Sequence, residues 1–149
     1  EPYDATTPRR SIRQSTAQTV PAGLVKELLV APMSAPSASN LHPWYFVVVN
    51  ERPQLDALTT VLPYGQMLKE APLASVVSGD APRQGTEGFW VQDCSAATQN
   101  ILLAAHAQGL GAVWLALGVL WGQVFVLFRL WTKMTFSAAQ AEFYRTSRP

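Results

Sequence analysis

The sequence predicts a single α+β domain, on the basis of chain length, two strand-like runs and three helix-like segments. The chain has 149 residues, which is the size of one ordinary domain. Two segments repeat apolar residues at helical spacing, a third is long and lacks proline and glycine, and two short runs are apolar and β-branched. We therefore expect residues 1–149 to form one domain.

The first predicted helix begins at Pro21, because proline is tolerated in the first turn of a helix. The apolar residues on one face of this helix are Leu24, Val25, Leu28 and Leu29. Pro32 is expected to end the helix, since its ring clashes with the preceding turn and its nitrogen carries no hydrogen. Residues 35–43 (APSASNLHP) then predict a loop.

Two strands and a second helix are predicted next. Residues 44–49 (WYFVVV) lack polar alternation, which predicts a strand covered on both faces and central in a sheet. Pro53 begins a helix that Pro63 closes, and the apolar face of this helix comprises Leu55, Leu58 and Leu62. Residues 73–78 predict another buried strand, followed by a surface loop over residues 79–88.

The longest predicted helix covers residues 89–108, and Gly109 stands where a left-handed C-terminal glycine is expected. From Cys94 to Phe128 the chain has 35 residues without a single Asp, Glu, Lys or Arg. A surface helix normally has a charged face. We therefore expect this helix to be buried on nearly all sides.

The composition excludes several classes of function. The net charge of +1 lacks the positive field that holds proteins on nucleic acid. One cysteine, Cys94, excludes an internal disulfide, and with only His42 and His106 beside it no zinc site is expected. The 48% hydrophobic and 14% charged shares indicate surface hidden in a partner subunit or a membrane. No apolar leader follows Glu1, so we expect a cytoplasmic protein or one whose export signal was removed.

Two clusters of polar residues could bind a ligand. Arg9, Arg10, Ser11 and Arg13 place three guanidinium groups and a hydroxyl within five residues, which suits a phosphate. The alternative is a solvated cluster of charges. Ser37, Ser39 and Asn40 could reach the polar edge of a ligand, but Pro, Ser and Asn are turn residues, so the loop taken alone favours an ordinary turn. The chain has no GxGxxG motif after a strand and no Walker motif.

Four segments in order resemble the FMN-dependent nitroreductase family over about residues 9–115: RRSIR at 9–13, APSASNLHPW at 35–44, KEAP followed by SVVSGD from 69, and the segment 90–114. The resemblance implies a three-layer fold of a central sheet flanked by helices. It also implies a homodimer, with helix 89–108 packed on its counterpart through an interface that includes Ala97 and Ala104.

The resemblance also implies a cofactor site. The family's segment matching Arg9, Arg10, Ser11 and Arg13 holds the FMN phosphate and ribityl chain, and the loop matching Pro36, Ser37 and Asn40 reaches the flavin of the opposite subunit. Leu115 and Ala116 would lie beside the isoalloxazine ring, and Gln66 near its pyrimidine edge. Two positions depart from the pattern, because Ala116 replaces glycine or an acidic residue and Gln66 replaces a lysine.

The implied activity transfers a hydride from NAD(P)H through flavin N5 to nitroaromatic or quinone-like acceptors in a ping-pong reaction. The flavin carries the chemistry, so no catalytic side chain is expected. Residues 117–149 do not match the family and form a divergent tail. Two alternatives remain: a flavin-binding or dimerising family remnant with little turnover, and a membrane-associated protein with a span near residues 110–128.

Overall fold

The computed structural model describes residues 6–16 and 18–115. Residues up to Trp114 belong to one compact unit. Its helices are α2 (Ala22–Met33), α3 (Arg52–Val61) and α4 (Trp90–Ala107), and its strands are β1 (Trp44–Val49) and β2 (Ala74–Gly79). Three short 3-10 turns join them: η1 (Ala38–Asn40), η2 (Gln66–Lys69) and η3 (Ala81–Arg83).

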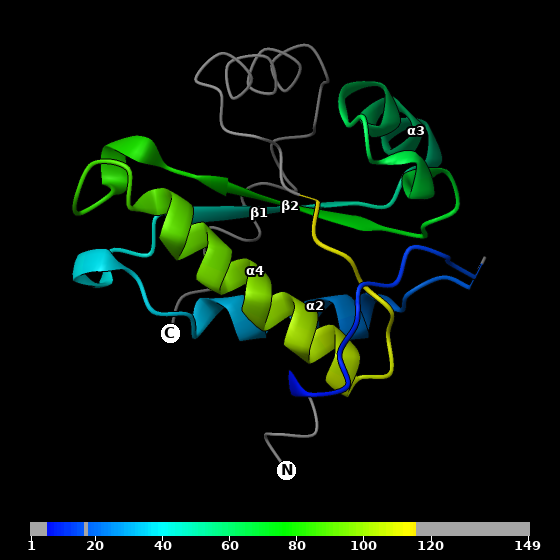
Figure 1. Ribbon diagram of the computed structural model, residues 1–149, viewed down its shortest axis with the longest axis horizontal. Coiled ribbons are helices and arrows are strands. Elements are labelled where there is room, and N and C mark those ends of the chain that lie inside the picture. Colours follow the sequence, from blue (N-terminus) through cyan, green and yellow to red (C-terminus); the bar gives the residue numbers. More distant parts are fainter. Residues whose placement is uncertain (1–5, 17, 116–149) are drawn as a thin grey trace. The chain divides into compact units, whose positions relative to one another are not determined.

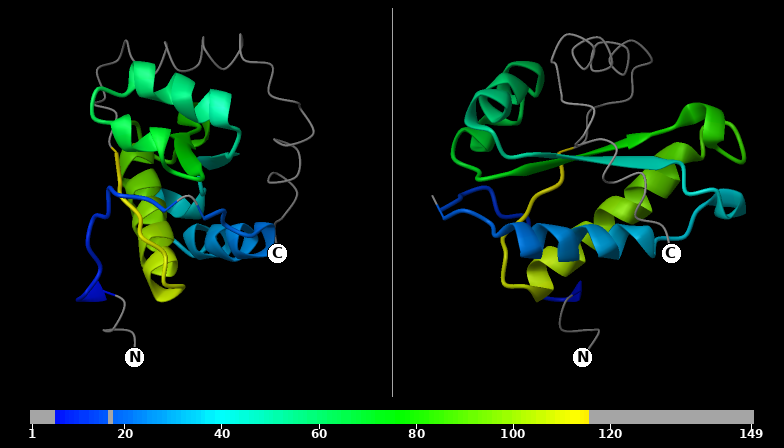
Figure 2. Two further views of the ribbon diagram at one scale, coloured as in Figure 1. Left: turned by 90° about the vertical axis from the view of Figure 1, so that its right-hand side faces the viewer. Right: turned by 180° about the vertical axis from the view of Figure 1, so that it is seen from behind.

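The described elements form layers around an antiparallel pair of strands, β1 and β2. Helices α2 and α4 pack against each other on one side of the strands, and α3 lies on the other side (Figures 1 and 2). The core combines Leu28 and Leu29 of α2, Phe46 of β1, and Ala97 and Leu102 of α4. The predicted three-layer α+β arrangement is therefore confirmed.

Strands β1 and β2 are antiparallel, with Trp44 opposite Gly79 and Val49 opposite Ala74. The expectation that β1 is covered on both faces was wrong at one position, because the side chain of Tyr45 is exposed. Its hydroxyl donates a hydrogen bond to Asp80 Oδ2 at 2.9 Å, which a fully apolar side chain could not do. The sheet of the described residues has two strands, so whether β1 is central in a larger sheet stays a prediction.

Helix α2 does not end at Pro32, as the sequence predicted, but continues to Met33. Pro32 is almost completely buried in the last turn of the helix. A proline there removes only its own N–H bond, and the chain leaves the helix within two residues. Ser34 N and Ala35 N donate to Ala31 O and Pro32 O, which satisfies the last turn.

Helix α4 crosses β2 and ends as the sequence predicted. Gly79 permits the crossing, because a Cβ atom there would meet the Trp90 ring at 2.2 Å. At the other end Gly109 adopts φ of 74°, and Leu110 N donates to Ala105 O at 2.8 Å. This is the Schellman pattern that closes a helix with a left-handed glycine.

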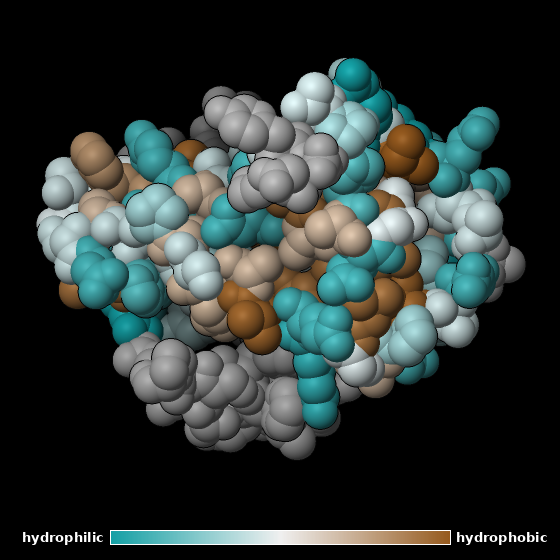
Figure 3. All heavy atoms as spheres, turned by 90° about the horizontal axis from the view of Figure 1, so that it is seen from below, coloured by the Kyte–Doolittle hydropathy of each residue, from teal (hydrophilic) through white to brown (hydrophobic). Residues whose placement is uncertain are grey.

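Within one chain α4 buries one face only, so the expectation of burial on nearly all sides is not met by this chain alone. Ala97 is 0% exposed, whereas Gln92 and Gln99 are exposed and Ala96 and Leu103 are half-buried. Figure 3 views the side on which α2 and α4 lie and shows exposed apolar surface between polar patches. The outer face of α4 is thus uncharged and partly exposed in this chain.

Residues 110–115 are not helical. Ala112 forms a parallel bridge with Ser11, and Ile12 N donates to Ala112 O at 3.1 Å. A membrane helix starting at residue 110 is therefore contradicted, while residues 116–128 of that alternative lie outside the described ones. In the described part of the chain, none of the helices has the length and hydrophobicity of a membrane span.

Candidate functional site

The arginine-rich segment lies beside the chain that leaves α4. The Ser11–Ala112 bridge fixes this neighbourhood, and Gly111 makes it possible, because a Cβ atom there would meet Ile12 Cγ2 at 2.8 Å. The segment expected to hold a phosphate is thereby adjacent to the stretch that leads to Leu115. Ala116, the other residue expected beside the ring, lies outside the described residues.

The predicted phosphate residues differ in their surroundings. Arg10 Nη1 donates to Thr7 O at 2.8 Å and to Arg9 O at 2.9 Å, so this guanidinium is engaged by its own segment. Arg9 is half-buried, and Ser11 and Arg13 are exposed. Arg9 and Arg10 line a depression near the C-terminal end of α4, together with Pro8, Ile12, Leu102, His106, Leu110 and Ala112.

The loop over residues 35–43 is held in an unusual backbone conformation. Ser39, Asn40 and His42 have φ values of 54°, 54° and 49°, in the left-handed region that non-glycine residues rarely adopt. His42 N donates to Ser37 Oγ at 2.9 Å, and His42 Nε2 pairs with Asn40 Oδ1 at 2.7 Å. The His42 ring stacks on Trp44 with 5.1 Å between ring centroids. Such backbone occurs in turns and is also typical of ligand-binding segments, so the role assigned to Pro36, Ser37 and Asn40 stays a prediction.

The loop is attached to the N-terminal end of α4. Ala38 N donates to Oδ1 of the buried Asp93 at 3.0 Å. The loop with Pro36, Ser37 and Asn40 therefore lies at one end of α4, and Arg9 and Arg10 lie near the other. From Asp93 to His106 the helix rises about 20 Å. Within one chain the structure keeps the two predicted groups apart.

Gln66, expected near the flavin pyrimidine, is exposed on η2 and donates to Thr59 O at 3.4 Å. Arg52 at the start of α3 holds this region, because its guanidinium donates to Leu68 O and, at 3.2 Å, to Ala71 O. It also pairs with Asp56 at 3.0 Å. Sequence reasoning missed Arg52, although its spacing of four residues from Asp56 was a visible signal of a helical ion pair.

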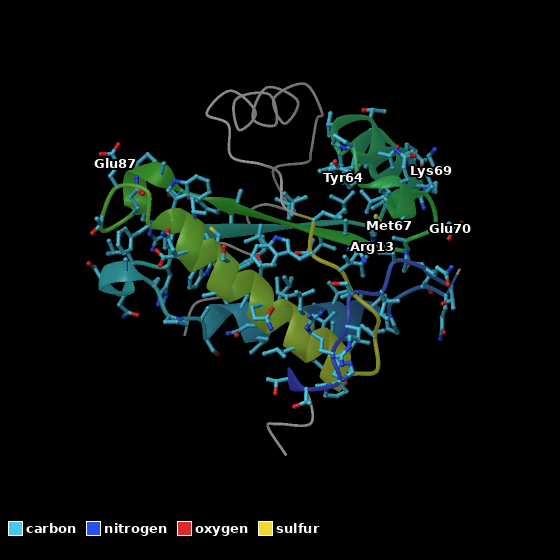
Figure 4. The ribbon with its side chains drawn as sticks, viewed as in Figure 1. Arg13, Tyr64, Met67, Lys69, Glu70 and Glu87 are labelled. Atoms are coloured by element: carbon cyan, nitrogen blue, oxygen red, sulfur yellow. The ribbon has the colours of Figure 1, made fainter. Side chains whose placement is uncertain are left out.

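A second depression lies where the arginine-rich segment continues toward η2. It is lined by Ser15, Thr19, Asn50, Arg52, Leu55, Lys69, Glu70, Ala71 and Pro72. Figure 4 shows Arg13 on the same side of the molecule as Met67, Lys69 and Glu70. The chain that follows RRSIR and the KEAP segment thus line one depression.

Cys94 is buried beside Asp93. Burial, with the charge of Asp93 as the smaller cause, raises the pKa of the thiol to about 12. The group therefore stays a neutral thiol and is no nucleophile. Among the described residues no group of His, Cys, Asp and Glu could hold a metal ion.

The model of the Nitroreductase family matches residues 7–77 and 52–118. The chain therefore belongs to the nitroreductase family, which confirms the resemblance inferred from residues 9–115. It is 52% identical over 106 residues to a protein of Methanothermobacter thermautotrophicus named as an NADH dehydrogenase/NAD(P)H nitroreductase, covering 71% of this chain and 56% of that protein. A protein of the same name from Archaeoglobus fulgidus is 46% identical over 109 residues, covering 72% and 62%.

Solved structures have the same fold. A Bacteroides thetaiotaomicron protein, also named as an NADH dehydrogenase/NAD(P)H nitroreductase, has a TM-score of 0.79 at 40% identity, covering 89% of this chain and 77% of that one. A nitroreductase from Desulfovibrio desulfuricans, solved in complex with FMN, has a TM-score of 0.78 at 36% identity, covering 88% and 76%. The chain spans less than two thirds of the length of the two archaeal relatives.

Proposed function

We propose that this chain is the FMN-binding part of an NAD(P)H-dependent oxidoreductase that works as a homodimer. Membership of the nitroreductase family supports the general class, and the FMN complex of the Desulfovibrio relative supports the cofactor. The names of the archaeal relatives support NAD(P)H as the electron donor. The acceptors that we propose are nitroaromatic or quinone-like compounds, reduced in a ping-pong reaction.

The separation of the two residue groups along α4 is the observation that carries the homodimer. Ser37 and Asn40 are attached near Asp93, and Arg9 lies beside His106. A two-fold axis that pairs α4 with its counterpart in the antiparallel direction brings the loop of one subunit to the arginines of the other. Each site then uses both chains, and neither chain has a complete site alone.

The phosphate contact is assigned to the arginine-rich segment. Residues 9, 11 and 13 of an extended segment share one face, so Arg9, Ser11 and Arg13 can converge on one phosphate group. Arg10, engaged with Thr7 O and Arg9 O, also stiffens the segment. Charged, paired hydrogen bonds make this set a good fit for a phosphate monoester.

The contact with the flavin ring is assigned to the loop over residues 35–43 and to residues expected near the edge of that ring. Ser37 Oγ already accepts a hydrogen bond from His42 N, which leaves its hydroxyl hydrogen free to be donated to a ligand. When bound, FMN supplies the hydride chemistry. The chain's own residues position the ring and exclude water, and those assigned to the ring are Pro36, Ser37, Asn40, Gln66, Leu115 and Ala116.

Flavin titration of the full 149-residue chain tests the cofactor site. Arg13→Gln should weaken FMN binding about ten- to a hundredfold, because each charged hydrogen bond contributes about 1.5 to 3 kcal/mol. Riboflavin, which lacks the phosphate, should bind the variant as it binds the parent. Arg83→Gln, on η3, is the matched control and should leave both affinities unchanged. A parent chain that binds no FMN refutes the proposal, and unchanged FMN affinity in Arg13→Gln refutes the phosphate assignment.

Turnover is tested by NADH and NADPH oxidation with menadione or a nitrofuran as acceptor. Parallel lines in double-reciprocal plots are expected for a ping-pong reaction. A chain that binds FMN but oxidises neither donor would be the family remnant with little turnover. Sedimentation of the parent chain as a monomer at micromolar concentration would refute the shared site.

A further inference from the structure

Asp93 is a buried carboxylate in the first turn of an otherwise uncharged helix. It is 5% exposed, and its Oδ1 accepts a hydrogen bond from Ala38 N at 3.0 Å. Its Oδ2 is buried and has no hydrogen-bond partner in the described part of the chain. Burying a carboxylate with one oxygen unsatisfied is costly, although the N-terminal end of the helix dipole offsets part of this cost.

The group that Asp93 holds is the loop with left-handed Ser39, Asn40 and His42. Left-handed backbone is unfavourable for residues with a side chain, although least so for Asn, so the loop needs support from the surrounding structure. The bonds from His42 to Ser37 and Asn40 join the loop to itself. The Ala38–Asp93 bond instead joins the loop to α4, across 55 residues of sequence.

A second contact confines the same loop, from Gly85 in the segment that precedes α4. Gly85 lies so close to Ser39 that a Cβ atom there would be 2.7 Å from Ser39 Oγ and 2.9 Å from Ser39 Cβ. A methyl group at residue 85 therefore requires Ser39 or residue 85 to shift, and this substitution leaves the Asp93 side chain itself unchanged. The loop is thus held from two sides by groups outside it.

We propose that Asp93 is a positioning residue for the cofactor site: through Ala38 it fixes the strained loop so that Ser37 and Asn40 are aimed at the flavin ring of the opposite subunit. This inference rests on the proposed function. A loop held before the ligand arrives loses little conformational freedom on binding, which favours affinity. Because the loop serves the ring and not the phosphate, loss of Asp93 should affect FMN and riboflavin alike.

The test titrates FMN and riboflavin into the full chain carrying Asp93→Ala, Asp93→Asn or Gly85→Ala. Asp93→Ala should weaken both flavins by about the same factor, on the order of tenfold, and change the visible circular dichroism of bound flavin. Asp93→Asn keeps an oxygen acceptor for Ala38 N and should restore most of the affinity and the spectrum. Arg13→Gln is the contrast, because it should weaken FMN only.

Each outcome bears on the inference. A folded Asp93→Ala chain, as judged by far-ultraviolet circular dichroism, that binds both flavins like the parent overturns it, as does a loss confined to FMN. If Asp93→Ala does not fold, Gly85→Ala decides: equal loss for both flavins supports a positioned loop, and unchanged binding overturns it. A parent chain that binds neither flavin refutes the proposed function and this inference with it.

Discussion

Arg52 links α3 to the segment that precedes β2, and its removal should have a measurable effect on stability. Its guanidinium donates to Asp56 Oδ1 at 3.0 Å, to Ala71 O at 3.2 Å and to Leu68 O. Asp56 is one turn further along the same helix, whereas the two carbonyl groups belong to the chain around η2. One planar group thus serves three acceptors, which only arginine can do.

The expected effect of Arg52→Met follows from these contacts, since methionine keeps the aliphatic stem and removes all donors. Two net hydrogen bonds to carbonyl groups contribute about 1 kcal/mol each. The ion pair adds only about 0.3–0.5 kcal/mol, because its side chains are 44% and 53% exposed. Removing a cation from a helix N-terminus returns a few tenths of a kcal/mol, roughly cancelling the ion pair. The free energy of unfolding should fall by about 2 kcal/mol.

Urea unfolding of the full chain, followed by tryptophan fluorescence, measures this change as a lower midpoint with an unchanged slope. Asp56→Asn is the control, because it removes the ion pair alone and should cost at most about 0.5 kcal/mol. Arg52→Lys should recover less than half of the loss, since an ammonium group cannot face three acceptors in one plane. Equal losses in Arg52→Met and Asp56→Asn would refute the contribution of the two carbonyl bonds.

Four further predictions concern buried side chains and the proposed interface. The Cys94 thiol has a pKa of about 12, against an ordinary value of 9.0. At pH 8 it should therefore react with a disulfide reagent about a thousandfold more slowly in the folded chain than in urea. Rapid labelling of the folded chain would contradict this prediction. The same shift means that the folded chain loses stability as pH rises from 9 toward 12, which unfolding at stepped pH measures. Ala96→Glu places a charge on the outer face of α4 and should weaken the proposed dimer by several kcal/mol, with exposed Ala57→Glu on α3 as the control in sedimentation. Leu55→Ala, at a side chain 1% exposed, should lower the free energy of unfolding by about 2–5 kcal/mol, and a loss below 1 kcal/mol would show a looser core than the structure has.

Ala96, and not Ala97, is the residue of α4 whose substitution tests the proposed interface. The sequence placed Ala97 and Ala104 in the interface between subunits, but Ala97 is fully buried within its own chain. A charge at residue 97 would therefore report on folding and not on association. Ala96, one residue away and about 100° around the helix, is on the outer side.

Local chemistry determined much of the fold from the sequence alone. The span of β1 and the helix end at Gly109 were predicted correctly, because neighbouring residues set backbone preference. The apolar face expected for α3 was only partly right, because Leu55 is buried whereas Leu62 lies just past the end of the helix at Val61. The order of the RRSIR, APSASNLHPW and KEAP segments was enough to identify the family. The error at Pro32 was also local, since a proline in the last turn of a helix loses little.

Tertiary structure alone decided how the candidate site is divided. No periodicity shows that Ala38 bonds to Asp93, or that Arg52 reaches Leu68 and Ala71, because these bonds join residues far apart in sequence. A lone charge in an uncharged helix was the one visible sign of Asp93. The separation of Ser37 and Asn40 from Arg9 along α4 depends on which helix end each segment packs against. Packing, and not local preference, therefore places these two groups near opposite ends of α4.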